Sequence, residues 1–334
     1  MKNKWFYRLT WTALVLTFAV VLLGAYVRLS DAGLGCPDWP GCYGHLDVPD
    51  EAHQIAKANE AYPERPVEAH KAWKEMIHRY FAGTLGLLIL AMAALAWRNR
   101  REPDQPVVLP VLLLGLVIFQ ALLGMWTVTW QLKPVVVMGH LLGGLTTLSL
   151  LAWLALRQGR YSGDAVIAQA RSLRVYAVLG LILLVGQIAL GGWTSANYAA
   201  LACPDFPTCQ TQWWPPTDFQ EAFTLWRGLG VSYEGGVLSN DARVTIHLMH
   251  RLGAVAILLY LGWLVWRLTV AGSRILRWAG IAIGVLLAVQ LSLGIANVVM
   301  QLPLPVAVAH NGGAALLLLA LVTLNHLLRP ETAT

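Results

Sequence analysis

The heptapeptide CPDWPGC occupies residues 36–42, and a close copy, CPDFPTC, occurs at residues 203–209. The copies differ only at the fourth and sixth positions, and together they contain all four cysteines of the chain. Four further pairs of similar motifs recur at a similar distance along the chain. LLGAYVR at 22–28 resembles ALGGWTS at 189–195, and IHR at 77–79 resembles MHR at 249–251. QALLG at 120–124 resembles QLSLG at 290–294, and VVVMGH at 135–140 resembles VAVAH at 306–310. Such regular separations, between 167 and 172 residues, indicate an internal duplication.

The composition is that of a membrane protein. Of the 334 residues, 57% are hydrophobic and only 13% are charged, whereas a soluble domain has about 25% charged residues. The net charge of +6 therefore does not indicate a nucleic-acid partner, and we expect none. Apolar runs of about 20 residues, the length that crosses a bilayer, predict eight spans at roughly 9–28, 76–97, 107–128, 134–157, 174–195, 243–266, 275–299 and 304–328.

We predict an all-α polytopic membrane protein made of two tandem four-helix bundles, residues 1–160 and 161–334. Each half contributes four spans, so both halves cross the membrane in the same direction, as a parallel repeat. Lys and Arg lie before the first span and after each even-numbered span, which by the positive-inside rule marks the cytoplasmic side. We expect a multi-pass protein of a bacterial inner membrane, with both termini in the cytoplasm and the segments 29–75 and 196–242 outside.

Both cysteine loops fall on the predicted outer side, which is oxidising in a bacterium, so each pair can form a disulfide. Four cysteines allow three pairings, and the repeat favours Cys36–Cys42 and Cys203–Cys209. A disulfide of this kind can be a staple that tightens the loop, or a redox-active dithiol that faces a cofactor. The residues themselves leave both alternatives open.

Four histidines share one depth in the predicted helices. His78 and His250 begin the second and sixth spans, and His140 and His310 lie about six residues into the fourth and eighth. Each half thus offers two inward-facing imidazoles, which suits the axial ligation of a haem iron. The small residues nearby would let a flat macrocycle approach: Gly83, Gly86, Gly143, Gly144, Gly312 and Gly313. The alternative is a set of histidines that hydrogen-bond between helices. Zinc is disfavoured, because no third ligand repeats in both halves.

The two halves differ beside these histidines. Glu75 precedes His78 by three residues and shares its helix face, whereas His247 stands at the matching position of the second half. We interpret His247 as a residue at the membrane interface, and Glu75 either as a solvated acid in a first helical turn or as a group with a chemical role. Three arginines are candidates for haem propionates, although snorkelling to the interface would also explain them: Arg28, Arg79 and Arg251.

These motifs together resemble those of the haem A synthase family. The resemblance rests on GAYVRLSDAGLGCPDWPGC at 24–42, EMIHR at 75–79, GH at 139–140, HLMHR at 247–251 and VAVAHN at 306–311, and it covers all eight spans. It implies an oxidoreductase of cytochrome oxidase assembly that converts haem O to haem A. The C8 methyl of the porphyrin would be hydroxylated twice, and the resulting gem-diol would lose water to leave a formyl group, with oxygen derived from water.

The resemblance also implies the roles of individual residues. His78 and His140 would bracket the substrate haem, His250 and His310 would ligate a haem b, and Glu75 would be the catalytic carboxylate. It further favours a lid or redox role for the pair Cys36 and Cys42. Two features depart from the repeat: a long polar segment between residues 42 and 75, and His247 as an extra ligand near His250.

Two other classes compete with this enzyme. A di-haem cytochrome b that carries electrons from quinol would explain the histidines, but not why an acid stands in one half only. A disulfide exchanger of the membrane would explain the cysteines and leave four histidines unused. Beyond membrane lipid, the partners we expect are a haem O synthase that hands over its product, cytochrome oxidase assembly factors, and further copies of the chain.

Overall fold

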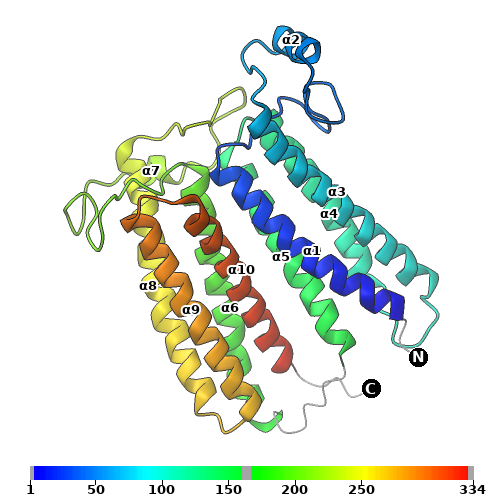
Figure 1. The fold of residues 1–334 in the computed structure, drawn as a ribbon. Helices are drawn as coiled ribbons and strands as arrows, with labels where there is room; N and C mark the ends of the chain where they lie inside the picture. The colour runs from blue at the N-terminus through cyan, green and yellow to red at the C-terminus, as the bar shows by residue number, and fades with distance from the viewer. Residues whose placement is uncertain (1–3, 160–166, 330–334) are drawn as a thin grey trace. The chain divides into compact units, whose positions relative to one another are not determined.

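The computed structural model describes residues 4–159 and 167–329, and every regular element in them is a helix. Figure 1 shows long, nearly straight helices joined at one end by extended loops. The helices are α1 (Lys4–Leu29), α2 (Ala52–Ala61), α3 (Ala69–Arg98), α4 (Val108–Thr129), α5 (Pro134–Gln158), α6 (Ile167–Ala196), α7 (Phe219–Ala222), α8 (Asn240–Thr269), α9 (Arg274–Val299) and α10 (Leu304–Leu327).

Eight of these helices are long and apolar enough to cross a membrane, and they coincide with the eight predicted spans. The other two, α2 and α7, are short helices in the two long loops. Large apolar side chains on the spans stay exposed, for example Leu87 at 68% and Leu259 at 68%, as expected where lipid instead of water covers the surface. The prediction of an all-helical, multi-pass membrane protein is confirmed.

Four helices begin earlier than the predicted spans. The apolar pattern placed their first residues at 9, 76, 174 and 243, but α1 begins at Lys4, α3 at Ala69, α6 at Ile167 and α8 at Asn240. Charged residues such as Lys71 and Lys74 end an apolar run, yet they are good helix formers, so the helix continues beyond the membrane. His78 therefore lies in the third turn of α3, with helix on both sides of it.

The chain divides into two compact units. Unit 1 comprises residues 1–147 and 224–237, and unit 2 comprises residues 148–223 and 238–334. In unit 1, α1 packs on α3, and α3 packs on α4. Small residues close the remaining sides of this bundle, because Gly124 of α4 faces His140 of α5 and Gly144 of α5 faces Val21 of α1.

Unit 2 contains a complete ring of four helices. Here α6 packs on α8, α8 on α9, α9 on α10, and α10 again on α6. Near one end of the ring, the side-chain amide of Asn325 donates to the carbonyl of Ala177 at 3.1 Å, so a buried polar pair joins α10 to α6.

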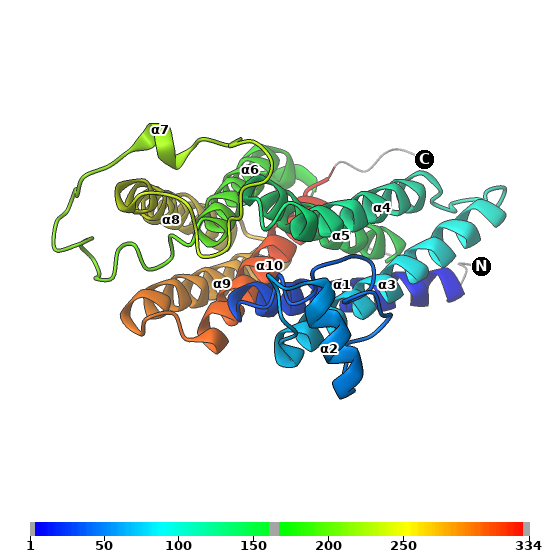
Figure 2. The same ribbon diagram turned by 90° about the horizontal axis from the view of Figure 1, so that it is seen from above.

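The segment 224–237 belongs to unit 1, although in sequence it lies between α7 and α8. The backbone N–H of Tyr233 donates to the carbonyl of Gln131 at 3.1 Å. The Nζ atom of Lys133, a fully buried residue, lies 3.1 Å from the centroid of the Trp226 ring and donates to the carbonyl of Gly228. Burial lowers the pKa of Lys133. This segment, which follows α7 and leads into α8 in Figure 2, is thus fixed by a cation–π contact and backbone hydrogen bonds.

The boundary predicted between residues 160 and 161 lies outside the described residues. The parallel repeat, the two domains and the side of the membrane on which each loop lies stay predictions.

Candidate functional site

The first cysteine loop is a compact, hydrogen-bonded turn closed by the disulfide Cys36–Cys42. Cys42 and His45 exchange two backbone hydrogen bonds, at 2.8 and 3.0 Å. The carboxylate of Asp38 accepts the N–H groups of Tyr43 and Gly44, both at 2.7 Å. Since Tyr43 and Gly44 have φ angles of 53° and 80°, Asp38 stabilises a left-handed turn that would otherwise be unfavourable.

The second loop has the same hydrogen-bond pattern around the disulfide Cys203–Cys209. Asp205 accepts the N–H groups of Gln210 at 2.6 Å and Thr211 at 3.0 Å, and these two residues also have positive φ angles. A hydrogen bond from the Thr208 hydroxyl lowers the pKa of Asp205. Both predicted cysteine pairs are therefore disulfide-bonded in the structure.

The long polar segment after the first loop packs against the disulfide. Cys36, Cys42 and Tyr43 form an apolar cluster with Val48 and with Ala58 of α2. Burial raises the pKa of Tyr43, whose hydroxyl donates to a backbone carbonyl at 3.2 Å. This departure from the repeat is thus a small lobe built around the first disulfide.

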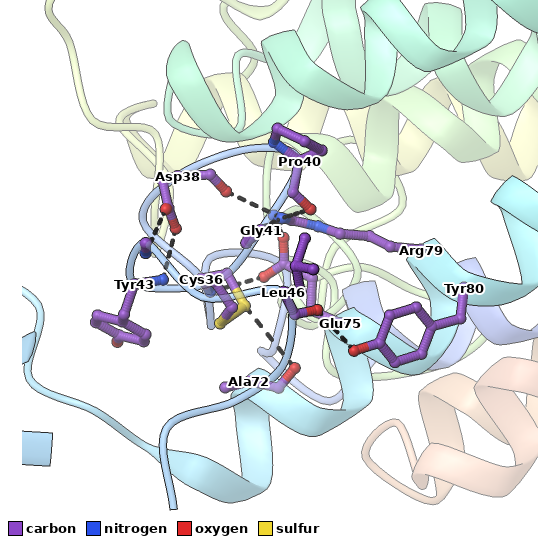
Figure 3. Close-up of a disulfide and its surroundings, with 12 residues drawn as sticks. Cys36, Asp38, Pro40, Gly41, Tyr43, Leu46, Ala72, Glu75, Arg79 and Tyr80 are labelled. Atoms are coloured by element: carbon purple, nitrogen blue, oxygen red, sulfur yellow. Dashed lines mark hydrogen bonds and ion pairs between the residues drawn. A yellow bond between two sulfur atoms is a disulfide. The ribbon is translucent and has the colours of Figure 1, made fainter. Parts of the chain in front are cut away.

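Glu75 lies beneath the first loop and is almost fully buried, with 5% exposure. Its Oε2 accepts the backbone N–H of Cys36 at 3.0 Å, and its Oε1 accepts Nη2 of Arg79 at 2.5 Å. Figure 3 shows these contacts between α3 and the loop. Of the two readings left open by the sequence, the solvated acid in a first turn is wrong, because the carboxylate is enclosed between a guanidinium and an amide.

His247 takes the same place in the second half. Its Nδ1 accepts the backbone N–H of Cys203 at 3.4 Å, as Glu75 accepts that of Cys36. The interpretation of His247 as an interfacial residue was wrong: it is buried, with 4% exposure, because the cysteine loop covers this face of α8. Each loop therefore rests on a buried acceptor, which is a carboxylate in one half and an imidazole in the other.

Each of the four ligand candidates lies against a glycine of a neighbouring helix. A Cβ added at Gly24 would lie 3.0 Å from Cε1 of His78, and one added at Gly191 would lie 3.0 Å from Cε1 of His250. For Gly124 and His140 the corresponding distance is 3.5 Å, and for Gly294 and His310 it is 3.1 Å. These glycines belong to repeated motifs, and a larger residue at any of them would press on the imidazole.

The glycines named in the sequence analysis play other parts. Cβ atoms built at Gly143 and Gly313 would collide with the side chains of Gln120 and Gln290. In contrast, nothing lies within 4 Å of a Cβ at Gly83 or Gly86, so these positions leave open space beside α3.

Glutamine side chains accompany the histidines of unit 2. Nε2 of Gln187 lies 3.1 Å from Nδ1 of His250, and Nε2 of Gln290 lies 3.4 Å from Nε2 of His310. Val20 stands at the position of the first half that matches Gln187. These glutamines were not predicted from the sequence, although the repeated QALLG and QLSLG motifs were a signal for one of them.

The histidines fit the axial ligands of a haem. Within the described part of the chain, Nδ1 of His78, His140 and His310 is buried and has no hydrogen-bond partner. Buried polar atoms of this kind are uncommon and call for a further partner. Two imidazoles from different helices of one bundle, with small residues beside them, are a suitable donor set for iron. Haem ligation by these residues nevertheless stays a prediction.

The predicted propionate partners Arg79 and Arg251 reach the cysteine loops. Nη1 of Arg79 donates to the Asp38 carbonyl at 3.0 Å, and Nη2 of Arg251 donates to the Cys203 carbonyl at 2.9 Å. Arg28 lies in the last turn of α1. A contact of any of the three with a propionate stays a prediction.

Comparison with known proteins shows the family. Residues 7–322 match the family model described as "Cytochrome oxidase assembly protein". A protein of Shewanella oneidensis named "Heme A synthase" is 50% identical over 98% of this chain and 97% of its own length. Proteins of the same name from Rhizorhabdus wittichii and Halalkalibacterium halodurans are 26% and 28% identical, over 93% and 87% of this chain and 90% and 86% of their own lengths. The chain therefore belongs to the haem A synthase family of cytochrome oxidase assembly proteins.

Proposed function

We propose that this membrane protein is a haem A synthase, an oxidoreductase whose substrate is haem O and whose product is haem A. The observation that carries the proposal is the 50% identity to a haem A synthase across 98% of the chain. The site supports it, because both halves present paired histidines and, among the residues that the structure describes, only the first half presents a buried carboxylate next to them.

In this proposal the substrate haem is held in unit 1 between His78 and His140. Both belong to this unit. Gly24 and Gly124 leave the imidazole edges uncovered by side chains.

Glu75 is proposed to be the catalytic carboxylate. Withdrawing electrons from the porphyrin methyl builds positive charge on that carbon, and a fixed negative charge in a water-poor site stabilises it. The carboxylate has about four acceptor positions, and Cys36 and Arg79 occupy one on each oxygen. The remaining positions can face the reacting carbon or accept a proton from an attacking water.

His250 and His310 are proposed to hold a haem b in unit 2. Bound there, haem b would supply a one-electron carrier for the electrons that the oxidation releases. Gln187 contacts the ring of His250 at Nδ1; with the amide turned so that its oxygen accepts Nδ1–H, Nε2 would carry no proton and would be free for iron. Such outer contacts orient a ligand and tune its basicity, so unit 2 is suited to a cofactor that stays bound.

The test is an analysis of haems extracted from the full-length protein, expressed in a host that makes haem O but no haem A. We expect haem A with the natural sequence and none with Glu75→Gln or His78→Ala. His250→Ala should lose the haem b spectrum. If the folded natural protein yields only haem b although haem O is present in the host, the result would support the di-haem cytochrome b. If it yields no haem at all, the result would support the disulfide exchanger.

We further propose that the cysteine loops face the outer side of a bacterial inner membrane, that both termini are cytoplasmic, and that a haem O synthase hands its product over directly. Labelling of single introduced cysteines with a membrane-impermeant reagent tests the sidedness. Haem A yield that is insensitive to the amount of haem O synthase, at constant haem O, would contradict the handover.

A further inference from the structure

Arg79 connects the first cysteine loop to Glu75. Its Nη1 donates to three loop carbonyls, those of Asp38 at 3.0 Å, Pro40 at 3.2 Å and Gly41 at 2.5 Å. Its Nη2 donates to Oε1 of Glu75 at 2.5 Å. The side chains of Arg79 and Glu75 are only 12% and 6% exposed, and Figure 3 shows the guanidinium directed into the loop. These are charge-assisted hydrogen bonds, the stronger kind.

The same carboxylate is tied to the loop a second time, because Oε2 of Glu75 accepts the N–H of Cys36 at 3.0 Å. The contacts therefore form a closed circuit that runs from the loop carbonyls through Arg79 and Glu75 to the Cys36 amide. Loss of any one member leaves a buried charge or a buried polar group without its partner, which is costly.

The second half contains the matched case. Nη2 of Arg251 donates to the carbonyls of Cys203 and Asp205, both at 2.9 Å, and its Nη1 donates to that of Thr208 at 2.8 Å. One turn before Arg251 stands His247, which accepts the Cys203 N–H. Holding the loop is thus common to both arginines, and the contact with a carboxylate is particular to Arg79.

The contacts argue against propionate binding as the main task of Arg79. Nη1 of a guanidinium carries two hydrogens, and three loop carbonyls surround that nitrogen. No donor of Nη1 is left for a further anion, so the fork of the guanidinium is used to join two parts of the protein.

We propose that Arg79 is a positioning residue, which holds the Cys36–Cys42 loop and the Glu75 carboxylate as one rigid group so that docking of the loop orients the carboxylate. The inference rests on the proposed catalytic role of Glu75 and goes beyond it. It assigns the first cysteine loop a part in the reaction that does not require its sulfurs to change oxidation state.

The test compares the two disulfides within one molecule. The full-length protein is treated with a water-soluble phosphine, and the freed thiols of each loop are alkylated and quantified by peptide mass spectrometry. Arg79→Gln should speed reduction of Cys36–Cys42 by about tenfold or more, because strong hydrogen bonds hold that loop, and leave Cys203–Cys209 unaffected. Arg251→Gln should show the reverse.

Haem analysis of the same samples links the loop to the reaction. We expect Arg79→Gln to lose haem A while it keeps the haem b spectrum, which a general folding defect would not allow. Arg79→Lys keeps the charge but not the planar fork, so it should restore part of the protection of the disulfide and part of the haem A yield, in proportion to each other.

The outcomes separate the two proposals. Unchanged reduction of Cys36–Cys42 in Arg79→Gln, or a natural yield of haem A despite faster reduction, would overturn the role of Arg79 and leave that of Glu75 intact. Natural activity of Glu75→Gln would instead remove the catalytic role of Glu75. If Arg79→Gln does not accumulate, Arg79→Lys is compared with the natural protein instead. The proposal would be overturned if Arg79→Lys and the natural protein had the same disulfide protection and the same haem A yield.

Discussion

The two cysteine loops share a disulfide, an aspartate that caps a left-handed turn, and an arginine that binds loop carbonyls. They differ in the buried side chain beneath them, which is Glu75 in the first half and His247 in the second. The common parts explain how a loop is held over a helix bundle. The difference shows where chemistry is to be sought, because only the first loop rests on a group that brings a negative charge.

Exchanging the two buried acceptors has the largest expected effect. Glu75→His should lower haem A formation by about 100-fold or more, because a neutral imidazole cannot stabilise positive charge on the reacting carbon. His247→Glu should fold, since Arg251 lies one helical turn away and offers the partner that Arg79 offers Glu75. Extracted haems and the disulfide state of both loops are the measurements. Substantial haem A from Glu75→His would end the distinction between the halves.

The glutamine beside His250 provides the next comparison. Gln187→Leu should weaken haem retention in unit 2 by about tenfold or more, because removal of an outer contact to a ligating histidine commonly has this effect. Val20→Leu, at the matching position of the first half, is the control. Haem b per protein after dilution in detergent measures the loss. Equal retention in both variants would mean that Gln187 does not orient His250.

Removing each disulfide should have a smaller effect, which still distinguishes the two loops. Each closes a loop with a sequence separation of 6, for which chain entropy predicts a contribution of about 2 kcal/mol. Cys36→Ala with Cys42→Ala should leave the first loop partly in place, because Glu75 and Arg79 still hold it. Cys203→Ala with Cys209→Ala should release the second loop further, because Arg251 holds that loop without the buried carboxylate that Arg79 contacts. Amide hydrogen exchange over residues 36–45 and 203–212 would test this order, and equal loss of protection in both would contradict it.

The smallest expected effect is the loss of stability of the second cysteine loop at low pH. The pKa of Asp205 is lowered by the Thr208 hydroxyl and by two N–H groups, so the folded loop favours the carboxylate. Its contribution to loop stability is then complete above the unfolded value of about 3.9 and is lost as pH falls through the lower folded value. Amide hydrogen exchange in the second loop should become faster as the pH falls below these two pKa values. Asp205→Asn should remove this dependence on pH. If Asp205→Asn still responds to acid, a group other than Asp205 is responsible for the pH dependence.

Much of this protein was predictable from its sequence. The number of spans and their positions follow from apolar runs, and the disulfide pairs follow from the repeated heptapeptide. The helix starts were missed where Lys71 and Lys74 extend α3 beyond the apolar run, since hydropathy reports membrane burial and not helix length. His247 was misread because its burial depends on a loop about forty residues earlier in the chain that folds back over α8.

The sequence by itself determined the eight helices, the family and the two disulfide pairs, because these depend on local composition and on motifs that recur at a nearly constant distance. The tertiary structure alone decided what each polar group meets. It brought the Glu75 carboxylate to the Cys36 amide, directed Arg79 and Arg251 to loop carbonyls, and packed the segment 224–237 into unit 1. Contacts of this kind join residues that are tens of positions apart, and they depend on how helices and loops pack, which no periodic pattern encodes.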